Sequence, residues 1–132
     1  MATQASPFLM FQGGVARAAI DFYTALFDDG AIVSMEEYGA QGPGPEGTVY
    51  RAHFRLAGQD FLATDSFISH DFDFTPSLSI WIDTETPAQI DELFDKLADG
   101  GQVLMPLGDY GFSARFGWVN DRFGVSWQLN LP

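Results

Sequence analysis

Apolar residues recur along the chain at two spacings, which predict helices and strands in a repeating order. Apolar positions every three or four residues predict one helix over residues 15–28, with Gly30 as its C-cap, and another from about Thr86-Pro87 to just before Gly100. Thr86 is typical of an N-cap, and Gln89 three residues later resembles a capping box. Short apolar or alternating runs predict strands over residues 8–11, 32–38, 48–56, 60–66, 78–82, around Val103, 115–120 and 125–129.

The same pattern occurs twice in the chain. Residues 19–35 align without a gap on residues 89–105, and each copy is preceded by an apolar strand and followed by two more. Each half therefore has the order βαβββ, and neither is large enough to close a core alone. We expect a first module over residues 7–66, a linker over 67–76 and a second module over 77–131, together forming one structural domain.

Composition and net charge exclude some classes of binding partner for this chain. Acidic residues outnumber basic ones 18 to 6, for a formal charge of −12, which opposes binding to nucleic acid or to an anionic membrane surface. Thirteen Phe, four Tyr and three Trp give a small sheet protein enough bulk to pack well. The sequence has no cysteine, shows no evident signal peptide and contains no long apolar run, so we expect a cytoplasmic protein that does not enter membranes.

Four motifs give the chain a family resemblance. They are Ala19-Ile-Asp-Phe-Tyr23, Thr64-Asp65-Ser66, Tyr110-Gly-Phe-Ser-Ala-Arg-Phe-Gly-Trp118, and Asp121-Arg-Phe-Gly124 followed by Trp127-Gln128. Together with the paired βαβββ order they resemble the vicinal oxygen chelate superfamily, also called glyoxalase/bleomycin-resistance/dioxygenase. The chain is most similar to its PhnB-like branch, whose members are often labelled demethylubiquinone methyltransferase-type domains. This resemblance implies an α+β fold in which the curved mixed sheets of two modules form a cleft, but one such fold hosts many activities.

The resemblance also implies where a metal would bind, namely on the first and last strands of each module. Those positions fall on Phe8 or Leu9, Leu78 or Ser79, Leu62 and Gln128, and none supplies His or a carboxylate. A single Gln cannot hold a divalent ion, so we expect no metal and no cofactor. One unfamiliar arrangement stays open, a triad made from His53, His70 and Asp65.

Residues on the predicted strands are candidates for lining the cleft. Three of them would form apolar walls and four would be polar anchors: Leu9, Phe11 and Trp81, and Arg51, His53, Arg115 and Gln128. Each also has a simpler explanation, namely core packing for the aromatic side chains, a solvated face for Arg51 and His53, an exposed ion pair for Arg115 and a structural hydrogen bond for Gln128. If His53 and Asp65 lie together, they are candidate catalytic residues, acting as acid and base.

These residues favour a metal-independent small-molecule binding protein whose ligand is unknown. The alternatives are a lyase or isomerase acting on a small oxygenated substrate, a drug-sequestering protein similar to bleomycin-resistance proteins, and a purely structural module. Because Arg51, Arg55 and Arg115 lie on predicted strands, we expect a small acidic or oxygen-rich ligand to be preferred over a bulky cation. The apolar surface of each half predicts a homodimer.

Overall fold

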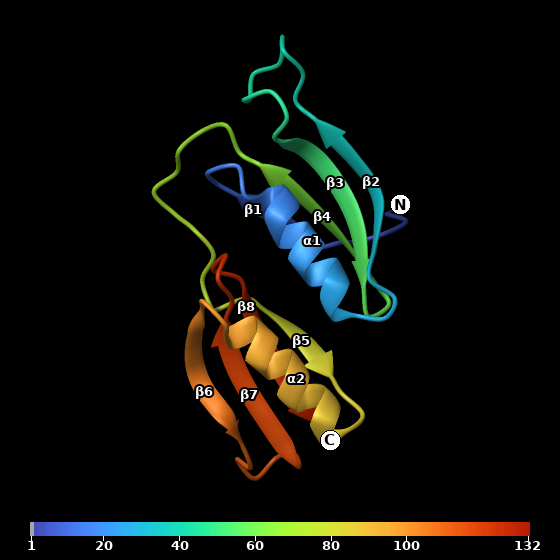
Figure 1. Ribbon diagram of the computed structural model, residues 1–132, viewed down its shortest axis with the longest axis vertical. Coiled ribbons are helices and arrows are strands. Elements are labelled where there is room, and N and C mark those ends of the chain that lie inside the picture. The colour runs from blue at the N-terminus through green and yellow to red at the C-terminus, as the bar shows by residue number, and fades with distance from the viewer. Residues whose placement is uncertain (1) are drawn as a thin grey trace. The chain divides into compact units, whose positions relative to one another are not determined.

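The chain folds into two compact units, divided between His70 and Asp71 (Figure 1). A computed structural model describes residues 2–132. The division falls inside the predicted linker at residues 67–76. The exact module limits, 7–66 and 77–131, and their union in one structural domain stay predictions.

The first unit consists of one helix and a four-stranded mixed sheet. Its elements, in chain order, are β1 (Phe8–Phe11), α1 (Ala16–Leu26), β2 (Ala31–Glu37), β3 (Val49–Leu56) and β4 (Gln59–Asp65). The strand order in the sheet is β1-β4-β3-β2, in which β1 runs parallel to β4 and the other neighbours are antiparallel. The first and last strands of the unit are therefore direct neighbours.

The second unit repeats this arrangement. Its elements are β5 (Ser79–Asp83), α2 (Pro87–Ala98), β6 (Gln102–Gly108), β7 (Arg115–Asn120) and β8 (Ser126–Leu131). The sheet order is β5-β8-β7-β6, with β5 parallel to β8. The predicted α+β fold of two βαβββ modules is confirmed.

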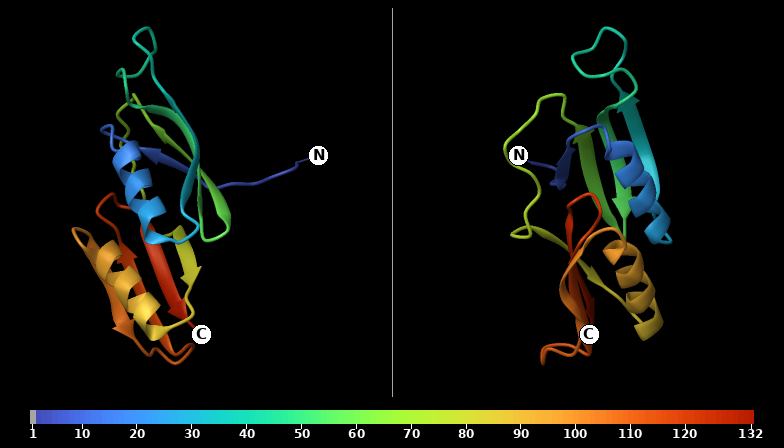
Figure 2. Two further views of the ribbon diagram at one scale, coloured as in Figure 1. Left: turned by 45° about the vertical axis from the view of Figure 1, so that its right-hand side comes forward. Right: turned by 60° about the vertical axis from the view of Figure 1, so that its left-hand side comes forward.

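In each unit the helix covers one face of the sheet (Figure 2). In the first unit the ring of Tyr23 on α1 stacks on Phe54 of β3, with centroids 6.5 Å apart. Ala52, Phe54 and Leu56 are buried on this side, while Arg51 and Arg55, one residue out of phase, are exposed. Because side chains of a strand alternate between faces, the sheet has a covered face and an open face.

The second sheet is covered in the same way. Gly117 of β7 lies directly beneath the Phe94 ring of α2, at a point where a Cβ would come within 2.6 Å of Phe94 Cε2. Val119 and Leu129 are buried on this covered side. Trp118 and Gln128, at the alternate positions, are only partly buried and lie on the open side.

The helix ends differ in part from the sequence-based expectation. Helix α1 ends at Leu26, and Gly30 does not adopt the left-handed conformation of a C-cap glycine. Glycine is needed at position 30 because a Cβ there would overlap the backbone carbonyl oxygen of Thr24. At the end of α2, by contrast, Gly100 does have a positive φ of 76°.

The start of α2 follows its sequence signature closely. The Thr86 hydroxyl accepts a hydrogen bond from the Gln89 backbone N–H at 3.1 Å, and Pro87 begins the helix. The Gln89 side chain accepts from the backbone N–H of Glu85 at 2.8 Å, one residue before the position that a capping box would use. Two otherwise unpaired backbone donors are thereby satisfied.

Two of the four edge strands, β2 and β6, pair irregularly with their neighbours. Register shifts interrupt the β2–β3 ladder between Ile32 and Ser34 and again between Glu36 and Glu37. The β6–β7 ladder shifts between Val103 and Met105 and once more before Gly108. Such irregularities increase the local twist of an edge strand.

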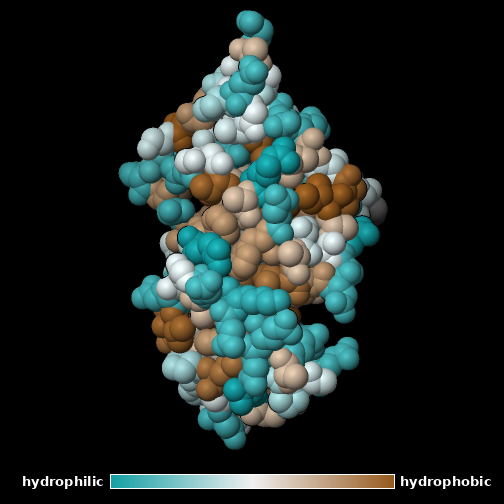
Figure 3. All heavy atoms as spheres, in the orientation of Figure 1, coloured by the Kyte–Doolittle hydropathy of each residue, from teal (hydrophilic) through white to brown (hydrophobic). Residues whose placement is uncertain are grey.

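The surface carries large apolar side chains on both units, seen as brown spheres in Figure 3. The most exposed include Phe8, Leu78 and Phe112, with 56%, 76% and 60% of their area accessible. Neither helix within residues 2–132 has the length and apolar composition required to cross a lipid bilayer.

Candidate functional site

The open face of the first sheet gathers the polar side chains of β3. Arg51, His53 and Arg55 alternate with buried apolar residues, so all three point away from α1. In the β3–β4 ladder, His53 lies opposite Leu62 and Arg55 lies opposite Asp60. The first unit therefore presents cationic and imidazole groups on a surface that its helix does not cover.

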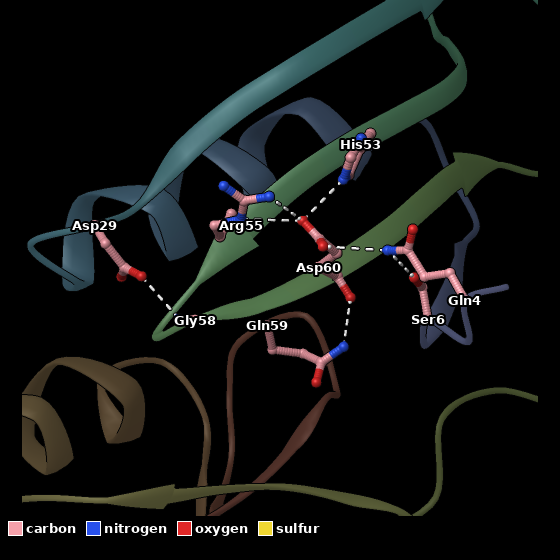
Figure 4. A network of polar contacts seen from close by, with 8 residues as sticks. All are labelled: Gln4, Ser6, Asp29, His53, Arg55, Gly58, Gln59 and Asp60. Atoms are coloured by element: carbon pink, nitrogen blue, oxygen red, sulfur yellow. Dashed lines mark hydrogen bonds and ion pairs between the residues drawn. The ribbon is translucent and has the colours of Figure 1, made fainter.

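Asp60 organises part of this face (Figure 4). One carboxylate oxygen, Oδ1, lies 3.0 Å from His53 Nε2 and 2.9 Å from Arg55 Nη2, and it also accepts from Arg55 Nε at 3.1 Å. The other oxygen accepts from Gln4 Nε2 at 3.1 Å. The hydrogen bond from His53, followed by that from Arg55, lowers the pKa of Asp60 below its ordinary value of 3.8. His53 and Arg55 are thus held in place by a carboxylate.

Arg51 is different, because no acidic side chain among residues 2–132 lies within ion-pair distance of it. The other five basic residues are paired, as Arg17–Glu37, Arg55–Asp60, Lys96–Glu92, Arg115–Asp91 and Arg122–Asp99. The Arg51 guanidinium instead lies over aromatic rings, 6.0 Å from the centroid of Phe8 and 5.7 Å from that of Tyr50. In a chain with three times as many acids as bases, this leaves one exposed cation able to bind an external anion.

The predicted catalytic pair, His53 with Asp65, does not come together. Asp65 is 3% exposed and lies on the covered face, where its two oxygens accept from the backbone N–H groups of Ala16 and Val49, both at 2.9 Å. Ala16 is the first residue of α1, so Asp65 caps this helix from β4. The carboxylate partner of His53 is Asp60.

Strand β1 exposes residues other than those expected to form an apolar wall. Leu9 and Phe11 are 6% and 1% exposed and contribute to the core. Alternation puts Phe8 and Met10 on the open face, where they pair in register with Leu62 and Thr64 of β4.

The open face of the second sheet has an amide between two tryptophans. Gln128 lies opposite Trp81 on one side and opposite Trp118 on the other. Trp81 is 49% exposed. Its ring contacts Phe116, with the two ring centroids 5.8 Å apart, and its indole N–H donates to Asp83 at 3.0 Å. The predicted site residues Trp81 and Gln128 are therefore neighbours on one open surface.

Arg115, the last predicted anchor, lies on the covered face of the second sheet. Its Nη2 is 2.7 Å from Asp91 Oδ1 on α2. Two residues further along β7, Gly117 contacts the same helix. The ion pair considered from sequence is thus present, and Arg115 shares no surface with Gln128.

Sequence analysis did not identify some residues of these open faces. The contact between Arg55 and Asp60 was predictable, because the tight turn at Ala57 and Gly58 makes these two residues cross-strand neighbours. Ser126 gave no such signal, because its contact with Ser79 joins strands far apart in the chain. The hydrogen bond that Ser126 accepts from Trp118 joins the consecutive strands β7 and β8, but it depends on their register.

The donors present do not fit a divalent metal. The paired open-face positions of the first and last strands are Phe8 with Leu62 and Met10 with Thr64, then Ser79 with Ser126 and Trp81 with Gln128. None has an imidazole, thiolate or carboxylate. The alternative triad of His53, His70 and Asp65 is not formed either, because no three His, Cys, Asp or Glu side chains among the described residues come together. The His70 ring instead forms a hydrogen bond with the Ser66 hydroxyl at 3.0 Å.

Comparison with known proteins assigns the family. Residues 3–130 match the family described as 3-demethylubiquinone-9 3-methyltransferase. The chain belongs to this family. A solved member, a PhnB protein from Bacillus cereus described as a putative 3-demethylubiquinone-9 3-methyltransferase, is 52% identical, with 98% of this chain and all of that chain covered and a TM-score of 0.94.

Two other proteins, one curated relative and one solved structure, are also similar to this chain. Protein YjdN of Escherichia coli K12 is 28% identical over 87 residues, which make up 66% of this chain and 58% of that protein, so the match spans less than two thirds of the curated relative. A glyoxylase/bleomycin resistance protein/dioxygenase domain from Frankia sp. EAN1pec has the same fold, with a TM-score of 0.68 at 15% identity and coverage of 99% and 98%. The predicted resemblance to the PhnB-like branch is confirmed by the family match and by the Bacillus cereus protein, and the Frankia domain shows a shared fold.

Proposed function

We propose that this chain is a metal-independent small-molecule binding protein that takes an acidic or oxygen-rich ligand on an open sheet face. The supporting observation is Arg51, an exposed guanidinium set on two aromatic rings with no acidic partner among the described residues. A guanidinium binds carboxylate or phosphonate through two parallel hydrogen bonds. Phe8, Met10 and Leu62 provide apolar area beside it.

The global charge of −12 opposes such a ligand, but the local contact outweighs it. A guanidinium at about 4 Å from an anion acts at close range, whereas surface carboxylates more than about 8 Å away are screened at physiological salt. Glu36 is a competitor within the sheet, since it lies opposite Arg51 in the β2–β3 register, although it does not reach ion-pair distance.

A methyltransferase activity, which the family description names, has less support. A nucleotide-like cofactor is commonly held at the amino end of a helix that follows a strand and a glycine-rich turn. Gly13 and Gly14 do lie between β1 and α1, but the Ala16 N–H that begins the helix is already bound by the buried Asp65 carboxylate. An anion at this helix end would have to displace that carboxylate.

The experiment is a thermal-shift series with benzoate, phenylphosphonate, benzylamine and bleomycin. The two anions are expected to raise the melting temperature, and Arg51→Met is expected to remove that rise while keeping the side-chain bulk. Arg17→Met is the matched control, because Arg17 forms its ion pair with Glu37 in the same unit but is contributed by α1. Stabilisation by benzylamine and bleomycin alone, unaffected by Arg51→Met, would replace this proposal with the drug-sequestering alternative.

An acid–base enzyme is the second candidate, supported by the 3.0 Å contact between His53 Nε2 and Asp60. A carboxylate that fixes one imidazole nitrogen leaves the other available for proton transfer. A lyase or isomerase of this type would exchange ligand C–H hydrogens in D₂O, detectable by NMR and lost in His53→Gln. Binding without exchange would favour the binding protein.

The protein is further proposed to act in the cytoplasm as a homodimer. The absence of cysteine is in keeping with a reducing compartment. Exposed apolar residues such as Leu78 and Phe112 are in keeping with a self-complementary interface.

A further inference from the structure

The open face of the second sheet contains a chain of hydrogen bonds whose donors can be counted. Gln128 Nε2 donates to the Ser79 hydroxyl at 3.1 Å, and Trp118 Nε1 donates to the Ser126 hydroxyl at 2.8 Å. The two serine oxygens lie 2.7 Å apart. Only one hydroxyl hydrogen can lie between them, so the other is left over.

Burial decides which serine keeps the spare hydrogen. Ser126 is 1% exposed, and a buried hydroxyl without an acceptor would cost about 1–3 kcal/mol. Ser126 therefore donates to Ser79. Ser79 is only partly buried, and its oxygen already accepts from Gln128, so its own hydrogen is directed outward.

The amide of Gln128 supplies the complementary group. Its nitrogen is engaged by Ser79, while its oxygen Oε1 accepts no hydrogen bond from any described residue. Since Oε1 and Nε2 share one carbon, the unused acceptor lies next to the outward hydroxyl of Ser79. A donor and an acceptor are thus presented side by side.

Aromatic surface borders this pair. Trp81 lies opposite Gln128 in the β5–β8 ladder. It is two residues after Ser79 on β5, so the two side chains lie on the same face of the sheet. Its ring is half exposed and is held in orientation by the bond to Asp83 and the contact with Phe116. A planar group could stack on it while meeting both polar atoms.

We propose that this face binds a planar lactam, that is, a flat ring in which a carbonyl and an N–H lie on the same edge. The ligand carbonyl accepts from Ser79, its N–H donates to Gln128 Oε1, and its ring lies against Trp81. The assignment rests on the proposed small-molecule function but uses neither Arg51 nor any other residue of the first unit. A carboxylate is disfavoured here because it has no hydrogen to give Oε1.

The test is an NMR titration of ¹⁵N-labelled protein with 2-quinolinone and N-methyl-2-quinolinone. Both offer the same ring and carbonyl, and only the first has the N–H. We expect 2-quinolinone to shift the Gln128 side-chain amide and Trp81 indole signals and to bind about tenfold more tightly, the factor that one hydrogen bond typically gives.

Variants decide between this pairing and simple stacking. Gln128→Met should abolish the preference for 2-quinolinone, and Ser79→Ala should weaken both ligands. Gln102→Met, the same change on the exposed edge strand β6, should alter nothing. Equal affinity for the two quinolinones, an undiminished preference in Gln128→Met, or tighter binding of benzoate than of 2-quinolinone at this face would overturn the proposal.

The two proposals fail in different ways. If no ligand of either series binds, the small-molecule function itself is wrong. If benzoate binds in an Arg51-dependent way while the quinolinones do not discriminate, only the lactam site is wrong.

Discussion

Two carboxylates of the first unit, the buried Asp65 and the partly buried Asp60, form hydrogen bonds with different kinds of partner. Asp65 bonds two backbone N–H groups on the covered face and fixes the start of α1. Asp60 lies on the open face and bonds His53 and Arg55. Although the two residues are five positions apart on one strand, alternation separates them onto opposite sides of the sheet.

Replacing Asp65 by Ala should lower the free energy of unfolding by about 2–4 kcal/mol. The change leaves the N–H groups of Ala16 and Val49 buried without an acceptor and removes the cap of α1. Urea denaturation measures the loss, and Asp65→Asn, which keeps one acceptor oxygen, should lose less. Asp95→Ala, an exposed change on α2, is the control, expected within about 0.5 kcal/mol. If Asp65→Ala loses no more stability than this control, Asp65 does not stabilise the start of α1.

Asp60 should make stability depend on pH. Because its pKa in the folded protein lies below the ordinary 3.8, the charged form stabilises the fold above pH 3.8, and this contribution is lost as the pH falls through the lowered pKa. Asp60→Asn should therefore be less stable than the parent at pH 7, and the difference should shrink as the pH falls below 3.8. Unfolding in urea between pH 7 and pH 2.5 measures both proteins.

The control for this pH dependence is Asp95→Asn. The Asp95 side chain forms no hydrogen bond or ion pair with the described residues. Its difference from the parent should stay small and flat. A difference for Asp60→Asn that is equally large at pH 7 and pH 2.5 would show that the carboxylate charge is not the stabilising feature.

At the scale of elements, periodicity predicted most strands and helices to within two residues. β1 and β7 have the predicted limits, residues 8–11 and 115–120. The helix ends were harder, because Gly30 is required by a close approach to the Thr24 carbonyl, which no local pattern reveals.

The candidate site was less predictable than the elements that carry it. Alternation separates Leu9 and Phe11 from Phe8 on β1, but it does not say which side a helix will cover. The partner of Arg115 is Asp91 on α2, and this contact follows from the packing of a helix on a sheet, which sequence spacing alone does not fix. The partner of His53 is Asp60 on the next strand, and this contact depends on the register that the tight turn between β3 and β4 sets.

The fit of α2 on its sheet depends on Gly117. A Cβ at this position would lie 2.6 Å from Phe94 Cε2 and 2.9 Å from Leu107 Cδ2, so the ring or the helix must move. Gly117→Ala should lower the free energy of unfolding by about 1–3 kcal/mol, as measured by chemical denaturation. Gly39→Ala is the matched control, because a methyl group added there would meet nothing within 4 Å and the φ of Gly39 is not positive. Equal stability of the two variants would contradict tight packing at Gly117.

At the scale of the whole molecule, apolar surface and net charge act in opposite directions on self-association. A charge of −12 on each chain disfavours approach of two copies, whereas exposed Phe8, Leu78 and Phe112 favour it. Apolar burial is insensitive to salt at these levels, while charge repulsion is screened.

Light scattering should therefore return a mass of twice the 14.5 kDa of the chain at micromolar concentration in 0.15 M salt. Lowering the salt should weaken the dimer because the two acidic chains then repel more strongly. A monomer mass under both conditions would contradict the proposed homodimer.

The irregular outer strands also bear on aggregation. A long, flat, apolar edge strand can add strands of other copies without limit. Here β2 has two register shifts and ends in Glu36-Glu37, and β6 has two shifts and includes Pro106, which has no N–H to donate. A neighbouring chain therefore finds no continuous row of hydrogen-bonding groups along either strand. This protects an aromatic-rich, sheet-forming chain from open-ended polymerisation at these two edges.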